Sequence, residues 1–182
     1  MKKIVLALAL TAGSILAGYA QEQTADPFQK VNETFASGKW RNGNSWTKGK
    51  VEVAEKDGKW AVTATPDDPK VTGLIYAPYK VDVQPGDKIQ VRVKASGKGK
   101  IRGAVWCYPT FVKGEKEKFL KALYGKPVDL TEESQEFVFE VEIPEKITVK
   151  SGEYEIAYIR AAVNFYGGSE AVVEQIVFQK VK

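Results

Sequence analysis

Short runs of β-branched and aromatic residues recur along this 182-residue chain, and clusters of Gly, Pro and Asp separate them. Within most runs, apolar and polar residues alternate. Because successive side chains of a strand point to opposite faces, this alternation predicts strands that bury one face. A helix would instead repeat its apolar residues every three or four positions. The pattern therefore predicts an all-β fold with the strands in a single antiparallel β-sandwich.

The clearest turn signal is Asp57-Gly58, which separates two alternating runs. Tight hairpin turns require positive φ angles, and Asp-Gly pairs adopt them readily. A second turn is expected at Pro85-Gly86. The runs that predict strands cover residues 51–55, 59–65, 71–76, 79–83, 88–95, 101–108, 135–143, 153–165 and 171–180.

Residues 109–126 interrupt this series of runs. Within them, Phe119, Leu120 and Leu123 recur at helical spacing. We therefore predict a short helix in residues 113–125, lying over one edge of the sandwich.

The first twenty residues have the composition of a secretory signal peptide. Lys2 and Lys3 precede an uncharged apolar stretch, and small residues at its end lead to Gln21. The stretch is short for a membrane span, which needs about 20 predominantly apolar residues. We predict a signal peptide at residues 1–20 and one sandwich domain at residues 21–182, secreted or periplasmic and without a membrane span.

Composition argues against several functional classes. The 27 basic and 23 acidic residues are interspersed, and a nucleic-acid-binding chain would instead cluster its basic residues. The chain has no histidine, which removes the usual catalytic triads and most zinc sites. Its single cysteine, Cys107, falls on an apolar strand face and is predicted to be a buried, inert thiol.

Three runs carry unusual residues on the face that points away from the core. In residues 88–94, 101–108 and 153–166 this face presents aromatic, guanidinium and amide groups. A solvated strand face more often carries Lys, Glu and Thr. Sugar rings stack on Trp and Tyr, and their hydroxyl groups suit planar amide and guanidinium donors, so the pattern favours carbohydrate binding. In the alternative, these residues pack beneath residues 109–126 and glutamates neutralise the arginines.

Four segments, in order, carry a family resemblance: residues 31–35 with Gly38 and Trp40, residues 81–91, Leu130-Thr131 before Phe137, and residues 173–178. With them the chain resembles the carbohydrate-binding modules of the galactose-binding-domain-like superfamily, the jelly-roll group that includes families 4, 9, 16 and 22. The resemblance implies an oligosaccharide or polysaccharide ligand, on a concave sheet face or at the rim.

Mapped onto this sequence, the resemblance implies the following carbohydrate-binding residues for the sheet face: Gln90, Arg92, Arg102, Trp106, Tyr108, Tyr158, Arg160 and Asn164. Rim binding would instead use Trp40, Trp46 and Tyr166. The resemblance also implies a structural calcium ion near the last strand, with Glu33 and Glu174 as its side-chain ligands. Gln175 stands where the family usually has a second acid, although calcium also accepts amide oxygens.

Two rival functions stay open beside a non-catalytic carbohydrate-binding protein. A protein-interaction or structural subunit of the cell envelope would use the same face, because interfaces also favour Tyr, Trp and Arg. A glycoside-active enzyme would need a pair of carboxylates. The candidate pairs are Glu140 with Glu142 and Asp67 with Asp68, and neither lies beside an aromatic-rich strand.

Overall fold

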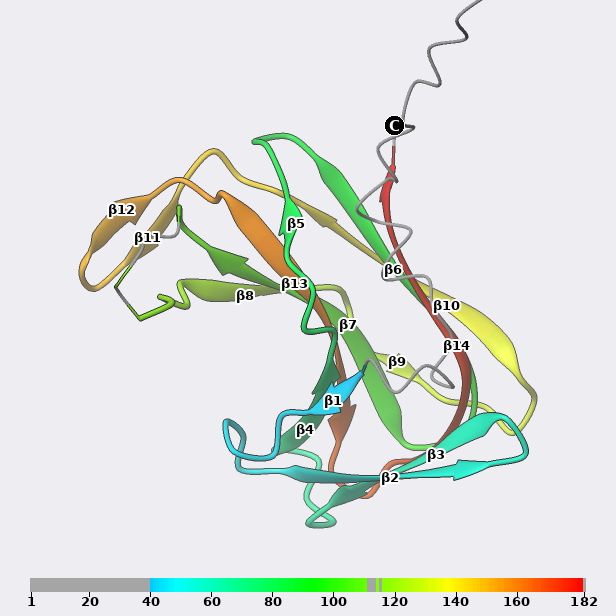
Figure 1. Cartoon of the computed structure of the whole chain (residues 1–182). Coiled ribbons are helices and arrows are strands. Elements are labelled where there is room, and N and C mark those ends of the chain that lie inside the picture. Colours follow the sequence, from blue (N-terminus) through cyan, green and yellow to red (C-terminus); the bar gives the residue numbers. More distant parts are fainter. Residues whose placement is uncertain (1–39, 111–113, 115, 182) are drawn as a thin grey trace, which may run out of the picture.

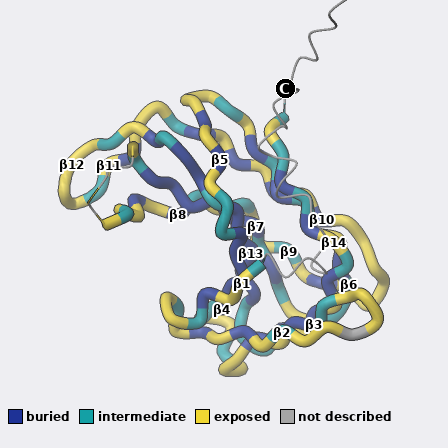
Figure 2. Tube along the Cα trace, in the orientation of Figure 1, coloured by how far each residue is buried: buried dark blue, intermediate teal, exposed yellow. Residues whose placement is uncertain are grey.

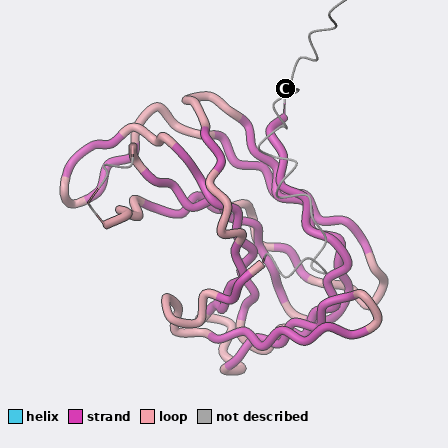
Figure 3. Tube along the Cα trace, viewed as in Figure 1, coloured by secondary structure: helices cyan, strands magenta, loops and turns pink. Residues whose placement is uncertain are grey.

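The computed structural model describes residues 40–110, 114 and 116–181, and these residues form strands and loops without a helix (Figure 3). Two antiparallel sheets pack face to face, which confirms the predicted all-β sandwich (Figure 1). Sheet A has the strand order β1-β4-β13-β7-β8, with β5 also paired to β13 and β9 to β7. Sheet B has the order β10-β6-β14-β3-β2. A separate hairpin joins β11 to β12.

The strands of sheet A are β1 (Arg41–Asn42), β4 (Thr72–Tyr76), β5 (Val81–Asp82), β7 (Lys100–Tyr108), β8 (Lys121–Tyr124), β9 (Val128–Asp129) and β13 (Tyr158–Tyr166). Those of sheet B are β2 (Lys50–Lys56), β3 (Lys59–Thr65), β6 (Lys88–Lys98), β10 (Gln135–Glu142) and β14 (Glu170–Val181). The remaining hairpin consists of β11 (Ile147–Val149) and β12 (Gly152–Tyr154).

The core lies between the sheets, where the apolar residues of the alternating runs meet. Sheet A contributes Ile101, Val163 and Phe165, and sheet B contributes Ile176 and Phe178, all fully buried. Figure 2 shows the buried residues following the strands of both sheets. Each large apolar side chain removed from water stabilises the fold by about 1.5–3 kcal/mol. The alternation therefore predicted correctly which face of β6, β7 and β13 is inside.

The predicted hairpin turn at Asp57-Gly58 is confirmed, because both residues have positive φ, at 54° and 70°. β2 and β3 pair on either side of it, with Lys56 opposite Lys59. The predicted strand 153–165 is instead divided, because residues 155–157 separate β12 from β13.

The predicted helix in residues 113–125 is wrong for the described part of that segment. Residues 116–120 have no regular structure, and Lys121–Tyr124 forms β8, which pairs with β7. Leu120 packs on the core, whereas the ring of its neighbour Phe119 contacts aromatic rings on the other face of sheet A. Neighbouring side chains that reach opposite faces indicate extended backbone. Pairing with β7 therefore overrides the local spacing of the apolar residues.

The chain crosses from sheet B to sheet A between β6 and β7. The crossing is tight, and at it Gly97 and Gly99 have φ of 130° and 94°. Ser169 is fully buried beside it. Its Oγ accepts a hydrogen bond from Lys100 N at 2.9 Å and donates one to Lys100 O at 3.1 Å. This corner sets the position of β7 in sheet A.

We expect Gly97→Ala to lower the free energy of unfolding by at least about 2 kcal/mol more than Gly86→Ala does. Both glycines have positive φ, but a Cβ at Gly97 would lie 2.1 Å from the carbonyl oxygen of Glu170, whereas nothing lies within 4 Å of a Cβ at Gly86. Urea unfolding of the two variants measures the difference. Equal losses would contradict the role assigned to the corner.

Candidate functional site

The face of sheet A that points away from the core carries a second buried cluster. Its members on β7 and β13 are spaced by two or four residues, as expected for one face of a strand. Its members are Leu74, Tyr76, Ala104, Trp106, Tyr108, Ala122, Tyr158 and Ala162. The central strands of sheet A are thus buried on both faces. We call this surface the outer face of sheet A.

Two segments contribute side chains over the outer face. The loop between β1 and β2 places Trp46 against Tyr76 and Trp106, with ring centroids 4.8 and 5.3 Å apart. The segment before β8 places Phe119 edge-on to Trp106 and Tyr108, at 5.8 and 5.9 Å. In Figure 1 the loop after β1 and the segment before β8 both lie to the left of β7 and β13, with the segment before β8 above the loop.

Aromatic rings run continuously between these two segments. Tyr76 stacks on Trp106 at 5.5 Å, and Tyr108 stacks on Tyr158 at 5.0 Å, nearly parallel. Such ring pairs stabilise a fold by about 0.5–1.5 kcal/mol each beyond the burial of their area. The rings that lie in the sheet are therefore held rigidly, and Trp46 and Phe119 extend the surface toward solvent.

A pocket of about 480 Å³ opens on the outer face. Its lining residues are Trp46, Thr47, Thr72, Leu74, Trp106, Tyr108, Glu117, Phe119, Ala122, Tyr124, Arg160 and Asn164. Three of the rings are open to solvent, since Trp46 is 57%, Phe119 51% and Tyr124 48% exposed. The pocket thus combines accessible apolar rings with hydroxyl, amide, guanidinium and carboxylate groups.

Asn164 brings an unpaired polar atom to the pocket. The residue is only 3% exposed, and its Nδ2 donates to Thr72 Oγ1 at 3.4 Å. Its Oδ1 is buried and accepts no hydrogen bond from the described residues. Leaving such an oxygen unpaired costs about 1–3 kcal/mol, and buried oxygens normally accept from protein, water or a ligand. Asn164 is therefore suited to accept a hydrogen bond from a bound molecule.

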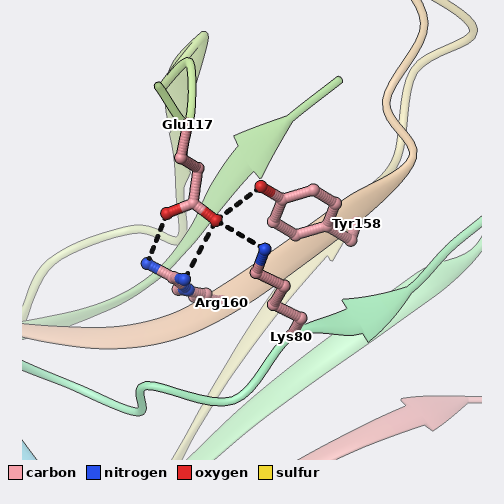
Figure 4. Close-up of polar contacts among 4 residues, drawn as sticks. All are labelled: Lys80, Glu117, Tyr158 and Arg160. Atoms are coloured by element: carbon pink, nitrogen blue, oxygen red, sulfur yellow. Dashed lines mark hydrogen bonds and ion pairs between the residues drawn. The ribbon is translucent and has the colours of Figure 1, made fainter. Parts of the chain in front are cut away.

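Glu117 is the centre of a polar cluster at one end of the pocket (Figure 4). Its Oε1 accepts from Tyr158 Oη at 2.6 Å and from Lys80 Nζ at 2.9 Å. Arg160 binds both carboxylate oxygens, with Nη2 3.0 Å from Oε1 and Nη1 3.0 Å from Oε2. These contacts hold the segment before β8 against β13.

The same contacts shift two pKa values in opposite directions. Burial alone would raise the pKa of Glu117, but hydrogen bonds from Tyr158 and Lys80 and the charge of Arg160 outweigh it and lower the pKa. Burial, together with the hydrogen bond to Glu117, raises the pKa of Tyr158. Tyr158 therefore stays a neutral donor and Glu117 an ionised acceptor at neutral pH.

Arg102 lies toward the other end of the outer face. Its guanidinium carbon is 3.7 Å from the ring centre of Tyr124 and 5.5 Å from that of Tyr166. In the sheet Arg102 is directly opposite Asn164. This stacked guanidinium thus stands beside the polar floor of the pocket.

The structure brings together six of the eight residues predicted for the sheet face. They are Arg102, Trp106, Tyr108, Tyr158, Arg160 and Asn164, all on β7 or β13. Of these, Trp106, Tyr108, Arg160 and Asn164 line the pocket. Trp106 and Tyr108 are nevertheless almost fully buried, at 8% and 4% exposed, so the alternative in which the face packs beneath residues 109–126 is realised in part.

Gln90 and Arg92 do not belong to this face, which corrects the sequence-based prediction. Both lie on β6 in sheet B. Gln90 donates to Glu140 at 3.1 Å and accepts from Gln179 at 3.1 Å, while Arg92 pairs with Glu136. Alternation identifies the outer side of a strand but not the sheet to which the strand belongs.

The residues predicted for rim binding are dispersed. Trp46 lines the main pocket, and Tyr166 lies near Arg102. Trp40 lines a separate pocket of about 360 Å³ together with Trp60 and Tyr76.

Sequence reasoning missed several residues of the site. Thr72, Leu74 and Tyr76 were assigned to a strand but not to its outer face, although their spacing of two would have indicated it. Glu117 and Phe119 were missed because their segment was assigned to a helix, and nothing local in the sequence connects them to β7 or β13.

The surroundings of Glu174 do not fit a calcium ligand. Its carboxylate binds Lys59 and Lys94, at 2.8 and 2.9 Å. Hydrogen bonds from these lysines lower the pKa of Glu174 to about 2, and two ammonium groups repel a divalent cation. Glu33 lies outside the described residues. Across the described part of the chain, no three His, Cys, Asp or Glu side chains are grouped to hold a metal.

The proposed carboxylate pairs lie away from the pocket. Glu140 and Glu142 are exposed on β10 of sheet B, and Asp67 and Asp68 lie in the loop after β3. Cys107 is fully buried, as predicted, and burial raises the pKa of its thiol to about 12.

No family model matches the sequence, and no curated protein matches it. Among the described residues, no helix is long and apolar enough to cross a membrane.

Comparison of the fold with solved structures finds carbohydrate-binding modules. A family 4 module is 13% identical, with 86% of this chain and 97% of that chain aligned at a TM-score of 0.47. The CBM22–GH10 part of Clostridium thermocellum endo-1,4-β-D-xylanase 10B, complexed with xylohexaose, is 12% identical at a TM-score of 0.49, with 84% of this chain and 27% of that chain covered. A family 29 module from Piromyces equi is 15% identical at a TM-score of 0.42, with 77% of this chain and 80% of that chain covered. At these values the comparison assigns no role to any residue, and the case for a ligand rests on the pocket.

The two tryptophans of the pocket differ in their structural roles. We expect Trp106→Ala to lower the free energy of unfolding by about 3–5 kcal/mol, because it removes a buried ring from the second cluster. Trp46→Ala should cost about 1 kcal/mol, since Trp46 is mostly exposed and loses only ring contacts. Urea unfolding measures both values. Equal losses would contradict the assigned burial.

Glu117 should make the fold sensitive to acid. Its lowered pKa means that its contribution is present above the ordinary pKa of a carboxyl group and is lost as the pH falls through the lowered value. Glu117→Gln should therefore flatten the loss of unfolding free energy on acidification. Urea unfolding across a pH series measures the slope.

Glu174→Gln is the matched control, because Glu174 has the same sign of shift but lies on sheet B. Glu174→Gln should also reduce the loss of unfolding free energy on acidification, over a pH range that extends down to about pH 2. A Glu117→Gln variant with the same pH dependence as the original protein would contradict the role of the cluster.

Proposed function

We propose that this protein is exported and binds a carbohydrate, without catalysis, in the pocket on the outer face of sheet A. The observation that carries the proposal is the combination of solvent-open rings and buried polar groups in one pocket. Trp46, Phe119 and Tyr124 offer apolar ring faces, while Arg160 and Asn164 offer hydrogen-bonding groups. Sugars require both, since their rings present C–H surfaces surrounded by hydroxyl groups.

The rigidity of the pocket floor supports binding. Trp106 and Tyr108 are held by neighbouring rings within the sheet, so they lose little conformational freedom when a ligand binds. Asn164 Oδ1 can accept from a sugar hydroxyl without giving up a hydrogen bond within the described structure. A preorganised floor with exposed rings above it therefore favours a saccharide of several units.

The electrostatics of Glu117 argue for binding without hydrolysis. A general acid needs a carboxyl group that is protonated near neutral pH, whereas the contacts of Glu117 lower its pKa. Glycoside hydrolysis also normally uses two carboxylates across the scissile bond. Glu117 is the one acid among the described lining residues.

The proposal is tested by titrating the purified protein with a panel of oligosaccharides in a calorimeter, with and without calcium. We expect saturable binding to one class of saccharide, and a loss of roughly tenfold or more in affinity for Trp46→Ala and for Phe119→Ala. Val138→Ala serves as the control, because Val138 is 50% exposed on sheet B, away from the pocket.

Absence of binding to any saccharide, or full affinity in both pocket variants, would contradict the proposal. A stable complex with an envelope protein that is lost in Trp46→Ala would instead support the interaction-subunit function. Sequencing the N-terminus of the protein recovered from the cell exterior or periplasm tests export, with cleavage before Gln21 expected.

A further inference from the structure

The groups around Glu117 form a receptor for a carboxylate. Arg160 and Tyr158 are fixed in β13, and Lys80 lies in the connection between β4 and β5. The carboxylate comes from a different element, residues 116–120, which form neither helix nor strand. The donors thus belong to the sheet and its connections, whereas the acceptor is carried by a segment without regular structure.

The contacts of Arg160 suit a planar carboxylate in particular. Its two terminal nitrogens bind the two carboxylate oxygens of Glu117, both at 3.0 Å. This is the bidentate geometry of a guanidinium–carboxylate pair. The Arg160 side chain is only 16% exposed. Because Glu117 and Arg160 both line the pocket, a ligand there can reach the guanidinium group of Arg160.

Several cationic side chains lie near the one described acid of the pocket lining. Glu117 contacts both Arg160 and Lys80, so its single negative charge is shared between two positive groups. Arg102 adds a third at the other end, and within the described structure it stacks on Tyr124 without an ion pair. The Nε atoms of Arg102 and Arg160 are buried and have no hydrogen-bond partner in the described residues.

The two arginines are separated along the sheet by small residues. Arg160 is opposite Trp106 and Arg102 is opposite Asn164, with Ala104 and Ala162 paired between them. These positions are four residues apart, about 13 Å along the strands at about 3.3 Å per residue. A molecule that meets both arginines must therefore be longer than one sugar ring or a simple ion.

We propose that the outer face of sheet A takes an acidic glycan, a chain with uronate units, whose carboxylates are bound by Arg160 in the pocket and by Arg102 beside it. This inference rests on the proposed function. In the free protein the carboxylate of Glu117 is bound to Arg160. When the glycan binds, a uronate carboxylate replaces that of Glu117 on Arg160. The rings of Trp46, Phe119 and Tyr124 then pack against the sugar units.

The test compares each acidic oligosaccharide with its own methyl ester, which has the same length but no charge. Oligomers of galacturonate, glucuronate and mannuronate are titrated calorimetrically in this way. We expect at least one acid form to bind roughly tenfold or more tightly than its ester at low salt, and the ratio to fall as salt is added.

Three variants connect this preference to the assigned residues. Arg160→Gln and Arg102→Gln should each bring the affinity for the acid form toward that of the ester. Glu117→Gln should raise the affinity for the acid form several-fold relative to that for its ester, because it removes the internal competitor. Far-ultraviolet circular dichroism and urea unfolding verify that each variant is folded, and Glu117→Gln keeps the shape of the original side chain.

The outcomes separate this inference from the proposed function. A neutral saccharide bound as tightly as any acidic one, in a manner that needs Trp46, would overturn the acidic preference and leave the pocket function standing. Stronger binding of a sulfated oligosaccharide than of any uronate would overturn the assignment to carboxylates. Failure of every saccharide to bind would overturn both proposals.

Discussion

The burial of both faces of sheet A is the constraint on which the rest of this structure depends. β7 and β13 pack one face against sheet B and carry the second aromatic and apolar cluster on the other. A face that contains Trp106, Tyr108 and Tyr158 is too apolar to remain in water, so other parts of the chain must lie over it. The loop before β2 and the segment before β8 contribute the rings that do so, and the pocket lies between their side chains. The site is thus a consequence of covering this face incompletely.

Covering the face also brings charge close to the aromatic rings. Arg160, whose side chain is largely buried, would be poorly compensated beside the buried cluster without Glu117, and an unpaired charge in such a place is costly. Glu117 compensates it and attaches its own segment to β13. Cation–π contacts add to this arrangement, with Lys80 4.6 Å from the ring centre of Tyr158 and Arg160 5.2 Å from that of Tyr108. The same network that stabilises the cover therefore also gives the pocket its polar character.

The outer face of sheet B shows the contrast. It carries ion pairs whose lysines are open to water. Among them are the pairs of Lys59 and Lys94 with Glu174 and of Lys98 with Glu170. Such exposed pairs contribute little to stability, typically up to about 1 kcal/mol each, and satisfy one another. Gln90 and Arg92 are part of this arrangement. The two outer faces of the sandwich thus have different chemistry, and the rings and pocket described above belong to sheet A.

The sequence by itself determined most of the strands and, for β6, β7 and β13, which side chains face inward, because alternation with a period of two is a local property of extended backbone. It therefore identified Trp106, Tyr108, Tyr158, Arg160, Asn164 and Arg102 as a shared type of surface. Only the tertiary structure decided that β6 joins sheet B, which removed Gln90 and Arg92, and that β8 replaces the predicted helix. It also decided that Glu117, Phe119 and Trp46 meet that surface. These outcomes depend on pairing between strands far apart in the chain, which the free energy of the whole packed sandwich sets and no local spacing encodes.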